Sequence, residues 1–153
     1  MIELDEKDKQ IFNILSENAR EKLTTIAKRI GLSIDATKKR IKKLEKLGVI
    51  TKYTIQADPA KYGYPLGTHI YLKLKGIKKE KFNEFVNFLV KKNNVIDVFS
   101  MIGDYDIYIV ALGKDARYLD EFKSEIKELF GDIITDWKEV IVGRIFKLEE
   151  YKI

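Results

Sequence analysis

The spacing of apolar residues in the first third of the chain predicts three short helices. Asp5 can cap the first helix, Gly31 ends the second, and Ser33 can cap a third that runs to about Leu47. Two helices joined by a tight glycine-containing turn, with another helix before them, form the helix-turn-helix pattern. The expected inward-facing positions are Ile11, Ile14, Leu15, Ile26, Ala27, Ile30, Thr37, Ile41, Leu44 and Leu47, with Ile34 at the edge of the last stripe.

The pattern after the third helix predicts a short strand followed by a linker. Residues 49–56, VITKYTIQ, are typical of a short strand, which favours the winged variant of the motif. Residues 57–67, ADPAKYGYPLG, hold both prolines and two glycines, which indicates a linker. We therefore expect a winged helix-turn-helix domain at 1–56, a linker at 57–67 and a second domain at 68–153.

The second domain alternates strand and helix periods. Two helices are expected, with Phe82, Phe85, Val86 and Leu89 inward in one and Leu119, Phe122, Ile126, Leu129 and Phe130 inward in the other. The order strand, helix, strand, strand, helix, strand is the ferredoxin-like βαββαβ arrangement, so the chain is of the α+β class. The expected ranges are strands at 68–76, 95–102, 106–113 and 132–152, the last bulged at Gly143, and helices at 78–93 and 115–130.

One predicted strand is apolar on both of its faces. Ile107 and Ile109 point to one side of the sheet, while Tyr108 and Val110 point to the other. Since both helices cover the same face of a ferredoxin-like sheet, the second apolar face needs another cover. A second copy of the domain would supply it, so we expect a homodimer through the sheets.

Composition limits the classes of protein that the chain can represent. Hydrophobic residues make up 45% and charged residues 35% of the 153 positions, and no apolar run approaches a membrane span. Cysteine is absent, which excludes disulfides, thiolate metal sites and a cysteine nucleophile. No secretion signal is recognisable, so we expect a cytoplasmic protein without membrane contact and without a cofactor.

The positive charge is confined to the first part of the chain. Residues 1–61 hold 14 Lys or Arg against 9 Asp or Glu, whereas residues 62–153 hold 15 of each. This asymmetry indicates that the N-terminal part meets a polyanion. The alternative interpretation is a charged surface that only confers solubility.

The third predicted helix concentrates this charge on one side. Six basic residues face only Asp35 and Glu45 as acidic neighbours in the helix, and like charges four residues apart destabilise it slightly. Contact with DNA phosphates would offset that cost, although a lysine-rich surface helix remains the simpler alternative. The candidate DNA-binding residues are Ser33, Asp35, Ala36 and Lys39 near base edges, Arg40, Lys42, Lys43 and Lys46 near phosphates, and Lys28 and Arg29 at the end of the second helix. For Arg40, an intramolecular role is equally expected.

A second candidate site lies between two predicted strands. Two carboxylates near a turn could hold the ammonium group of an amino acid, and nearby backbone N–H groups could bind its carboxylate. A plain hairpin turn explains the same residues. The candidate effector-binding residues are Met101, Gly103, Asp104, Tyr105 and Asp106.

Catalysis finds no support in the sequence. The single histidine, His69, begins a strand without a neighbouring catalytic set, no glycine-rich phosphate loop is present, and no metal-ligand spacing stands out. We therefore expect no enzyme. The remaining alternative to a sequence-specific regulator is an architectural protein that coats DNA with little sequence preference and binds no effector.

Several motifs together resemble one family over essentially the full length. They are LDEKDKQIFNIL, IAKRIGLS, KKRIKKLEKLGVITKYT, DPAKYG and GDYD, and they are similar to the Lrp/AsnC, or feast/famine, transcription regulators. The resemblance implies sequence-specific DNA binding by the N-terminal domain. It also implies a C-terminal ferredoxin-like domain that dimerises, assembles further to octamers, and binds an amino acid effector near the GDYD turn. The bulky Trp137 and Lys138 stand where the family tends to carry small hydroxyl residues.

Overall fold

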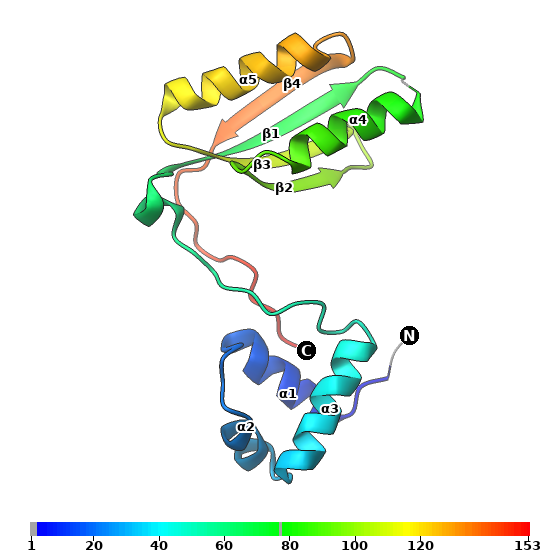
Figure 1. The fold of residues 1–153 in the computed structure, drawn as a ribbon, viewed down its shortest axis with the longest axis vertical. Helices are drawn as coiled ribbons and strands as arrows, with labels where there is room; N and C mark the ends of the chain where they lie inside the picture. Colours follow the sequence, from blue (N-terminus) through cyan, green and yellow to red (C-terminus); the bar gives the residue numbers. More distant parts are fainter. Residues whose placement is uncertain (1–2, 77) are drawn as a thin grey trace. The chain divides into compact units, whose positions relative to one another are not determined.

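The computed structural model describes residues 3–76 and 78–153 and divides them into two compact units. The first unit holds the described residues up to Gln56 together with Phe146–Ile153, and the second holds Ala57–Ile145. Figure 1 shows helices in the first unit and a sheet with helices in the second. Among the described residues, no helix combines the length and the apolar content that crossing a membrane requires.

The first unit contains the three predicted helices, α1 (Glu6–Glu17), α2 (Leu23–Ile30) and α3 (Ile34–Lys46). Their ends are set by the expected local signals. Asp5 accepts a hydrogen bond from the Asp8 amide at 2.9 Å, and Ser33 accepts one from the Ala36 amide at 3.2 Å. Gly31 closes α2 with a φ of 68°, a left-handed conformation that glycine adopts without steric cost. The prediction of a helix-turn-helix is thereby confirmed.

The three helices enclose a small apolar core. Its buried members are Ile11, Ile14, Leu15, Ile26, Ile30 and Leu44, with Leu4, Leu32, Ile41, Val49 and Ile50 packed at its edge. The stripe predicted for α3 is shorter than expected, because Leu47 lies past the helix end and is exposed. What remains buried on α3 is centred on Thr37 and Leu44.

The strand predicted at 49–56 does not form. This segment is extended but has no ladder to a neighbouring strand, and Tyr53 and Ile55 are exposed. An alternating sequence becomes a strand only where a second backbone offers hydrogen bonds, and no described segment of the unit pairs with it in this way. The winged form of the motif is therefore not present within one chain.

The second unit has the predicted βαββαβ order. It consists of η1 (Pro59–Tyr62), β1 (Leu66–Leu74), α4 (Lys79–Val90), β2 (Val95–Ser100), β3 (Ile107–Gly113), α5 (Ala116–Phe130) and β4 (Ile134–Ile141). The strands form one antiparallel sheet in the order β2-β3-β1-β4. The ferredoxin-like prediction is confirmed.

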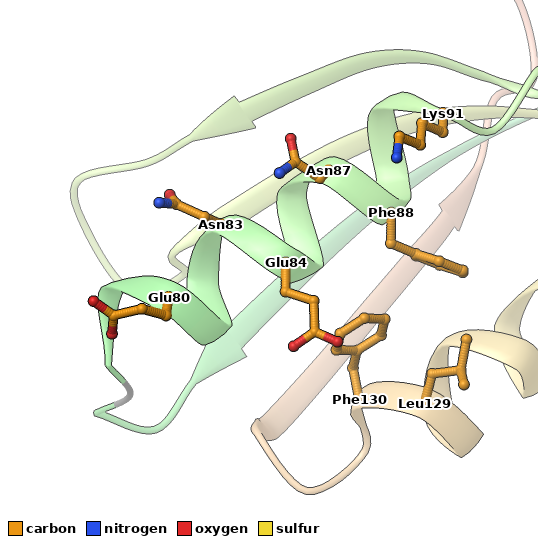
Figure 2. A pocket seen from close by; sticks show the side chains of 8 residues that line it. All are labelled: Glu80, Asn83, Glu84, Asn87, Phe88, Lys91, Leu129 and Phe130. Carbon is orange, nitrogen blue, oxygen red and sulfur yellow. The ribbon is translucent and has the colours of Figure 1, made fainter.

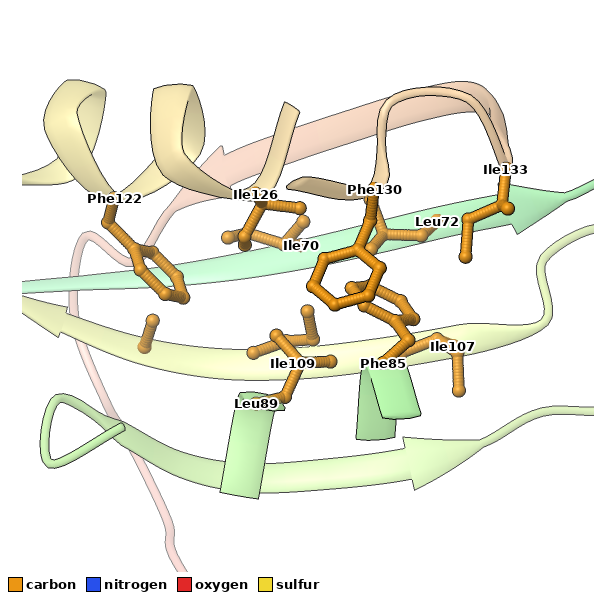
Figure 3. Packing of buried hydrophobic residues seen from close by; sticks show 11 residues of the cluster. Ile70, Leu72, Phe85, Leu89, Ile107, Ile109, Phe122, Ile126, Phe130 and Ile133 are labelled. Carbon is orange, nitrogen blue, oxygen red and sulfur yellow. The ribbon is translucent and has the colours of Figure 1, made fainter. Parts of the chain in front are cut away.

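The core of this unit lies between the sheet and its two helices (Figure 3). Phe85 and Leu89 of α4 and Phe122 and Ile126 of α5 meet the alternate side chains of β1 and β3. Leu129 departs from the prediction: it is exposed, because the last turn of α5 directs the neighbouring Phe130 inward instead.

The last strand is much shorter than predicted. β4 ends at Ile141, and the register irregularity of the β1–β4 pair lies between Lys73 and Leu74, not at Gly143. The residues from Phe146 onward belong to the first unit, where the Asn13 side chain exchanges two hydrogen bonds with the Ile153 backbone at 2.9 and 3.0 Å. The Val142 amide still donates to the Gly67 carbonyl at 2.8 Å, and the following residues are no longer part of the sheet.

The face of the sheet opposite the helices is lined by aromatic side chains. The strand register places Phe99, Tyr108, Tyr71 and Lys138 in one row across all four strands. Phe99 stacks on Tyr108 with ring centroids 5.6 Å apart, and Tyr108 lies 5.0 Å from Tyr71. Both helices of the unit pack on the other face of the sheet, so Phe99 is exposed and Tyr71 and Tyr108 are half-buried.

Candidate nucleic-acid interface

The side of α3 that faces away from the core is charged. Lys39, Lys42 and Lys46 are exposed there together with Asp35, at spacings of three and four residues that keep them on one helical face. None of these three lysines forms an ion pair with the described residues. The expected surface of unneutralised positive charge is thus present on α3.

Two other predicted phosphate ligands, Arg40 and Lys43, bind carboxylates at the start of α1. Arg40 Nη1 binds Asp5 at 2.7 Å and Asp8 at 2.8 Å, and Lys43 Nζ binds the second oxygen of Asp8 at 2.6 Å. The Asp8 carboxylate is 0% exposed. We call Asp5, Asp8, Arg40 and Lys43 the α1–α3 ion cluster. For Arg40, the intramolecular alternative is the one that the structure shows.

The cluster also shifts the pKa values of Asp5, Asp8 and Arg40. Burial raises the pKa of Asp8, but hydrogen bonds from Lys43 and Arg40 outweigh it and hold that pKa below its usual value. The Asp8 amide and the Arg40 guanidinium lower the pKa of Asp5, and both carboxylates raise the pKa of Arg40. Asp5, Asp8 and Arg40 are therefore charged at neutral pH, and the ion pairs of the cluster fix α3 against α1.

The sequence itself carries a signal for this cluster in the position of Asp8. Asp8 precedes Ile11 by three residues and Leu15 by seven, so it lies on the buried stripe of α1. A carboxylate on such a stripe needs a buried cationic partner. The basic residues of α3 were the nearest candidates.

The remaining predicted residues surround the N-terminal end of α3. Ser33 caps the helix, Asp35 is exposed and Ala36 is half-buried. Lys28 and Arg29 lie exposed in the last turn of α2, just before the Gly31 turn that joins it to α3.

The predicted effector residues lie in the connection between β2 and β3. Asp106 is already engaged, because its carboxylate accepts a hydrogen bond from the Leu74 amide at 2.7 Å. Tyr105 donates to Asp136 of β4 at 3.2 Å, whereas Met101, Gly103 and Asp104 are exposed. Asp104 is therefore the exposed acid of the loop, and Asp136 of β4 is a further carboxylate beside Tyr105.

A hollow of about 360 Å³ lies between the end of α5 and the start of β4. Trp137 forms one wall, and the ammonium groups of Lys123 and Lys127 lie 5.4 and 5.9 Å from its ring centre. Trp137 also packs against the core cluster. The lining residues are Lys127, Gly131, Ile134, Thr135, Asp136 and Trp137.

A larger hollow, about 660 Å³, lies between α4 and the end of α5 (Figure 2). Phe88, Leu129 and Phe130 provide its apolar surface, while Asn83 and Asn87 point along its rim. In the part of the chain that the structure describes, no group of three or more His, Cys, Asp or Glu side chains is placed to hold a metal ion.

Comparison with known proteins agrees with this geometry. Residues 4–45, which span α1, α2 and nearly all of α3, match the AsnC-type helix-turn-helix domain. The transcriptional regulator LrpA of Pyrococcus horikoshii is 37% identical over 123 residues, which cover 79% of this chain and 84% of the relative. The chain belongs to the Lrp/AsnC family of helix-turn-helix transcriptional regulators. The resemblance noted from the sequence motifs is confirmed.

Further relatives of this Lrp/AsnC protein cover both of its units. The regulator FL11 of Pyrococcus abyssi is 33% identical over 130 residues, or 85% of this chain and 84% of the relative. A transcriptional regulator of Neisseria meningitidis, solved as a complex with L-Met, has the same fold, with a TM-score of 0.86 at 23% identity over 95% of this chain and 94% of that one. The family consists of regulators, which confirms that the protein is not an enzyme.

Proposed function

We propose that this Lrp/AsnC-family protein regulates transcription in the cytoplasm by binding a specific double-stranded DNA sequence through α3. The observation that carries the proposal is the row of exposed lysines Lys39, Lys42 and Lys46 on α3, which form no ion pair with any described carboxylate. Selection of binding sites from random DNA, followed by chemical footprinting, tests it.

The two ends of α3 have different roles in this proposal. When a recognition helix enters the major groove by its N-terminal end, the first residues lie nearest the base edges. Asp35 can then accept from cytosine N4 and Lys39 can donate to guanine, while Ser33 and Ala36 allow close approach. The phosphate ligands are Lys42 and Lys46 of α3 and Lys28 and Arg29 of α2, since Arg40 and Lys43 are held by the α1–α3 ion cluster.

This assignment leaves about four phosphate contacts per protomer. A dimer would release counterions from about eight phosphates, so the logarithm of affinity should fall with the logarithm of salt concentration at a slope of about −7. An architectural protein would show a similar slope but nearly equal affinity for all sequences. The ratio of specific to non-specific affinity therefore separates the two functions.

We further propose that the aromatic face of the sheet is the homodimer interface. It carries Phe99, Tyr108 and Tyr71 in one row, next to the hydrogen bond between the Tyr108 hydroxyl and His69 Nδ1 at 2.9 Å. Aromatic side chains of this kind are enriched at the centres of protein interfaces. Further assembly, up to the octamer that the family resemblance implies, would use other surfaces.

Placing charge on this face should dissociate the dimer. In the double variant Tyr71→Asp, Tyr108→Asp, two carboxylates per protomer would lose their hydration at the interface, and we expect dimerisation to weaken by more than about a thousandfold. Sedimentation equilibrium measures the change. As a matched control, Asn83→Asp, Asn87→Asp adds the same charge beside the hollow of Figure 2 and should leave the dimer intact. Equal dissociation of both variants, or of neither, would contradict the proposed interface.

We also propose that an amino acid effector binds at the loop of residues 101–106. Asp104 supports this, because it offers an exposed carboxylate for an ammonium group beside the backbone of Gly103 and Met101. Tyr105 and Asp106 hold the loop in place through Asp136 and the Leu74 amide. The L-Met complex of the Neisseria regulator supports an amino acid as the ligand class.

Titration of the protein with each amino acid tests the effector proposal. Trp137 is the single tryptophan, and its amide donates to the same Asp136 carboxylate that Tyr105 binds. The true effector should therefore change the fluorescence of Trp137 and raise the melting temperature. The Asp104→Asn variant should bind at least about tenfold more weakly, whereas Asp132→Asn, an exposed acid outside the loop, should bind normally. No response of either observable to any amino acid would refute the proposal.

A further inference from the structure

The first residue of α3 is an apolar side chain that the core does not use. Ile34 is 47% exposed, and it belongs neither to the core cluster of its unit nor to the residues packed at the edge of that cluster. Among the described residues of α1, α2 and α3, it is the one large apolar side chain that is exposed. Single exposed apolar residues are common on surfaces, so exposure alone does not indicate a function for Ile34. Its position at the start of α3 does.

Ile34 occupies the end of α3 that reaches deepest into DNA in the proposed function. It directly follows the Ser33 cap, whose hydroxyl oxygen already accepts the Ala36 amide. It lies next to the exposed Asp35 and one turn before the exposed Lys38. The tip of the helix therefore presents one carboxylate and one branched alkyl group to whatever it contacts.

The major groove contains one apolar group at the base edges, the C5 methyl of thymine. We infer that Ile34 is a specificity-determining residue that recognises a thymine in each half-site by contact with this methyl group. The inference rests on the proposed function, because it requires α3 to enter the major groove by its N-terminal end. In addition, it attributes part of the preference for a DNA sequence to an apolar contact and not to hydrogen bonds.

Replacing thymine by deoxyuridine removes the methyl group and leaves base pairing unchanged. In the site selected by the full-length protein, we expect one thymine per half-site at which deoxyuridine weakens binding about fourfold. Changing both half-sites should weaken binding about fifteenfold. These values correspond to the burial of one methyl-sized group per contact. The Ile34→Ala variant should bind the thymine and deoxyuridine duplexes equally at that position. Leu47→Ala, which removes an exposed leucine just past the other end of α3, should keep the full wild-type discrimination.

Circular dichroism checks that both variants keep the wild-type melting temperature, as expected for exposed side chains. The inference is overturned if no thymine of a specific site is sensitive to loss of its methyl group. It is also overturned if Ile34→Ala discriminates as strongly as the wild type. A protein that binds every sequence equally would instead overturn the proposed function, and this inference with it.

Discussion

The triple variant Lys39→Ala, Lys42→Ala, Lys46→Ala is expected to bind DNA at least about a thousandfold more weakly than the wild type at about 0.1 M salt. Two of these lysines are assigned to phosphates, so a dimer would lose about four phosphate contacts, each giving close to a tenfold gain in affinity at this salt concentration. The slope of log affinity against log salt should fall from about −7 to about −4. Fluorescence anisotropy at several salt concentrations measures both quantities.

The loss of three positive charges has to be separated from the loss of these particular side chains. Lys75, Lys79 and Lys91 are exposed in the second unit and form no ion pair with the described residues. Their triple alanine variant changes the net charge equally and should weaken binding by no more than about tenfold through the general field of the protein. If the two triple variants bind alike, α3 is not the DNA-binding surface.

The variant Asp8→Ala is expected to destabilise the first unit by about 3 kcal/mol, because it removes the buried acceptor shared by Arg40 and Lys43. This loss of stability is at the lower end of the range for breaking a buried ion pair, because Arg40 and Lys43 are 30% and 46% exposed and can be hydrated. For a unit of this size the midpoint of thermal unfolding should fall by more than about 10 °C. Circular dichroism of the helices follows the transition.

The pH dependence of stability gives a second test of the same cluster. The pKa of Asp8 is lowered in the folded state, so its contribution is present above the unfolded value of about 3.9 and is lost as pH falls through the lower folded value. The wild type should therefore lose stability below about pH 4, and Asp8→Ala should show a flatter profile there. Asp35→Ala, which removes an exposed acid from α3, should alter stability by less than about 0.5 kcal/mol. If Asp8→Ala has the same stability and the same pH profile as the wild type, the α1–α3 ion cluster does not stabilise the fold.

The parts of the fold that the sequence predicted correctly depend on local signals. Asp5, Ser33 and Gly31 mark helix ends through backbone hydrogen bonds within a few residues, and the pattern predicted them without knowledge of the tertiary structure. The change from a period of 3.6 to a period of 2 was enough to give the order of the second unit. These features involve contacts between near neighbours in the chain.

The failures concern contacts between distant residues. The segment at 49–56 alternates like a strand but finds no partner ladder, and the residues after Ile141 leave the sheet although their sequence continues to alternate. Likewise, the partners of Arg40 and Lys43 lie 32 to 35 residues away, so helical spacing alone placed both lysine and arginine on the DNA face. Periodicity indicates which face of a helix or strand is apolar, but it does not identify the distant residues that contact that face.

Dimethyl sulfate footprinting of the selected DNA site tests the central claim most directly, because the reagent methylates guanine N7 in the major groove and adenine N3 in the minor groove. The account predicts a defined sequence in which two segments, centred about 10 base pairs apart on one face of the duplex, are protected at guanine N7. Adenine N3 within those segments should stay reactive. Protection confined to adenine N3, or uniform protection of every sequence tested, would contradict a role for α3 in reading the major groove.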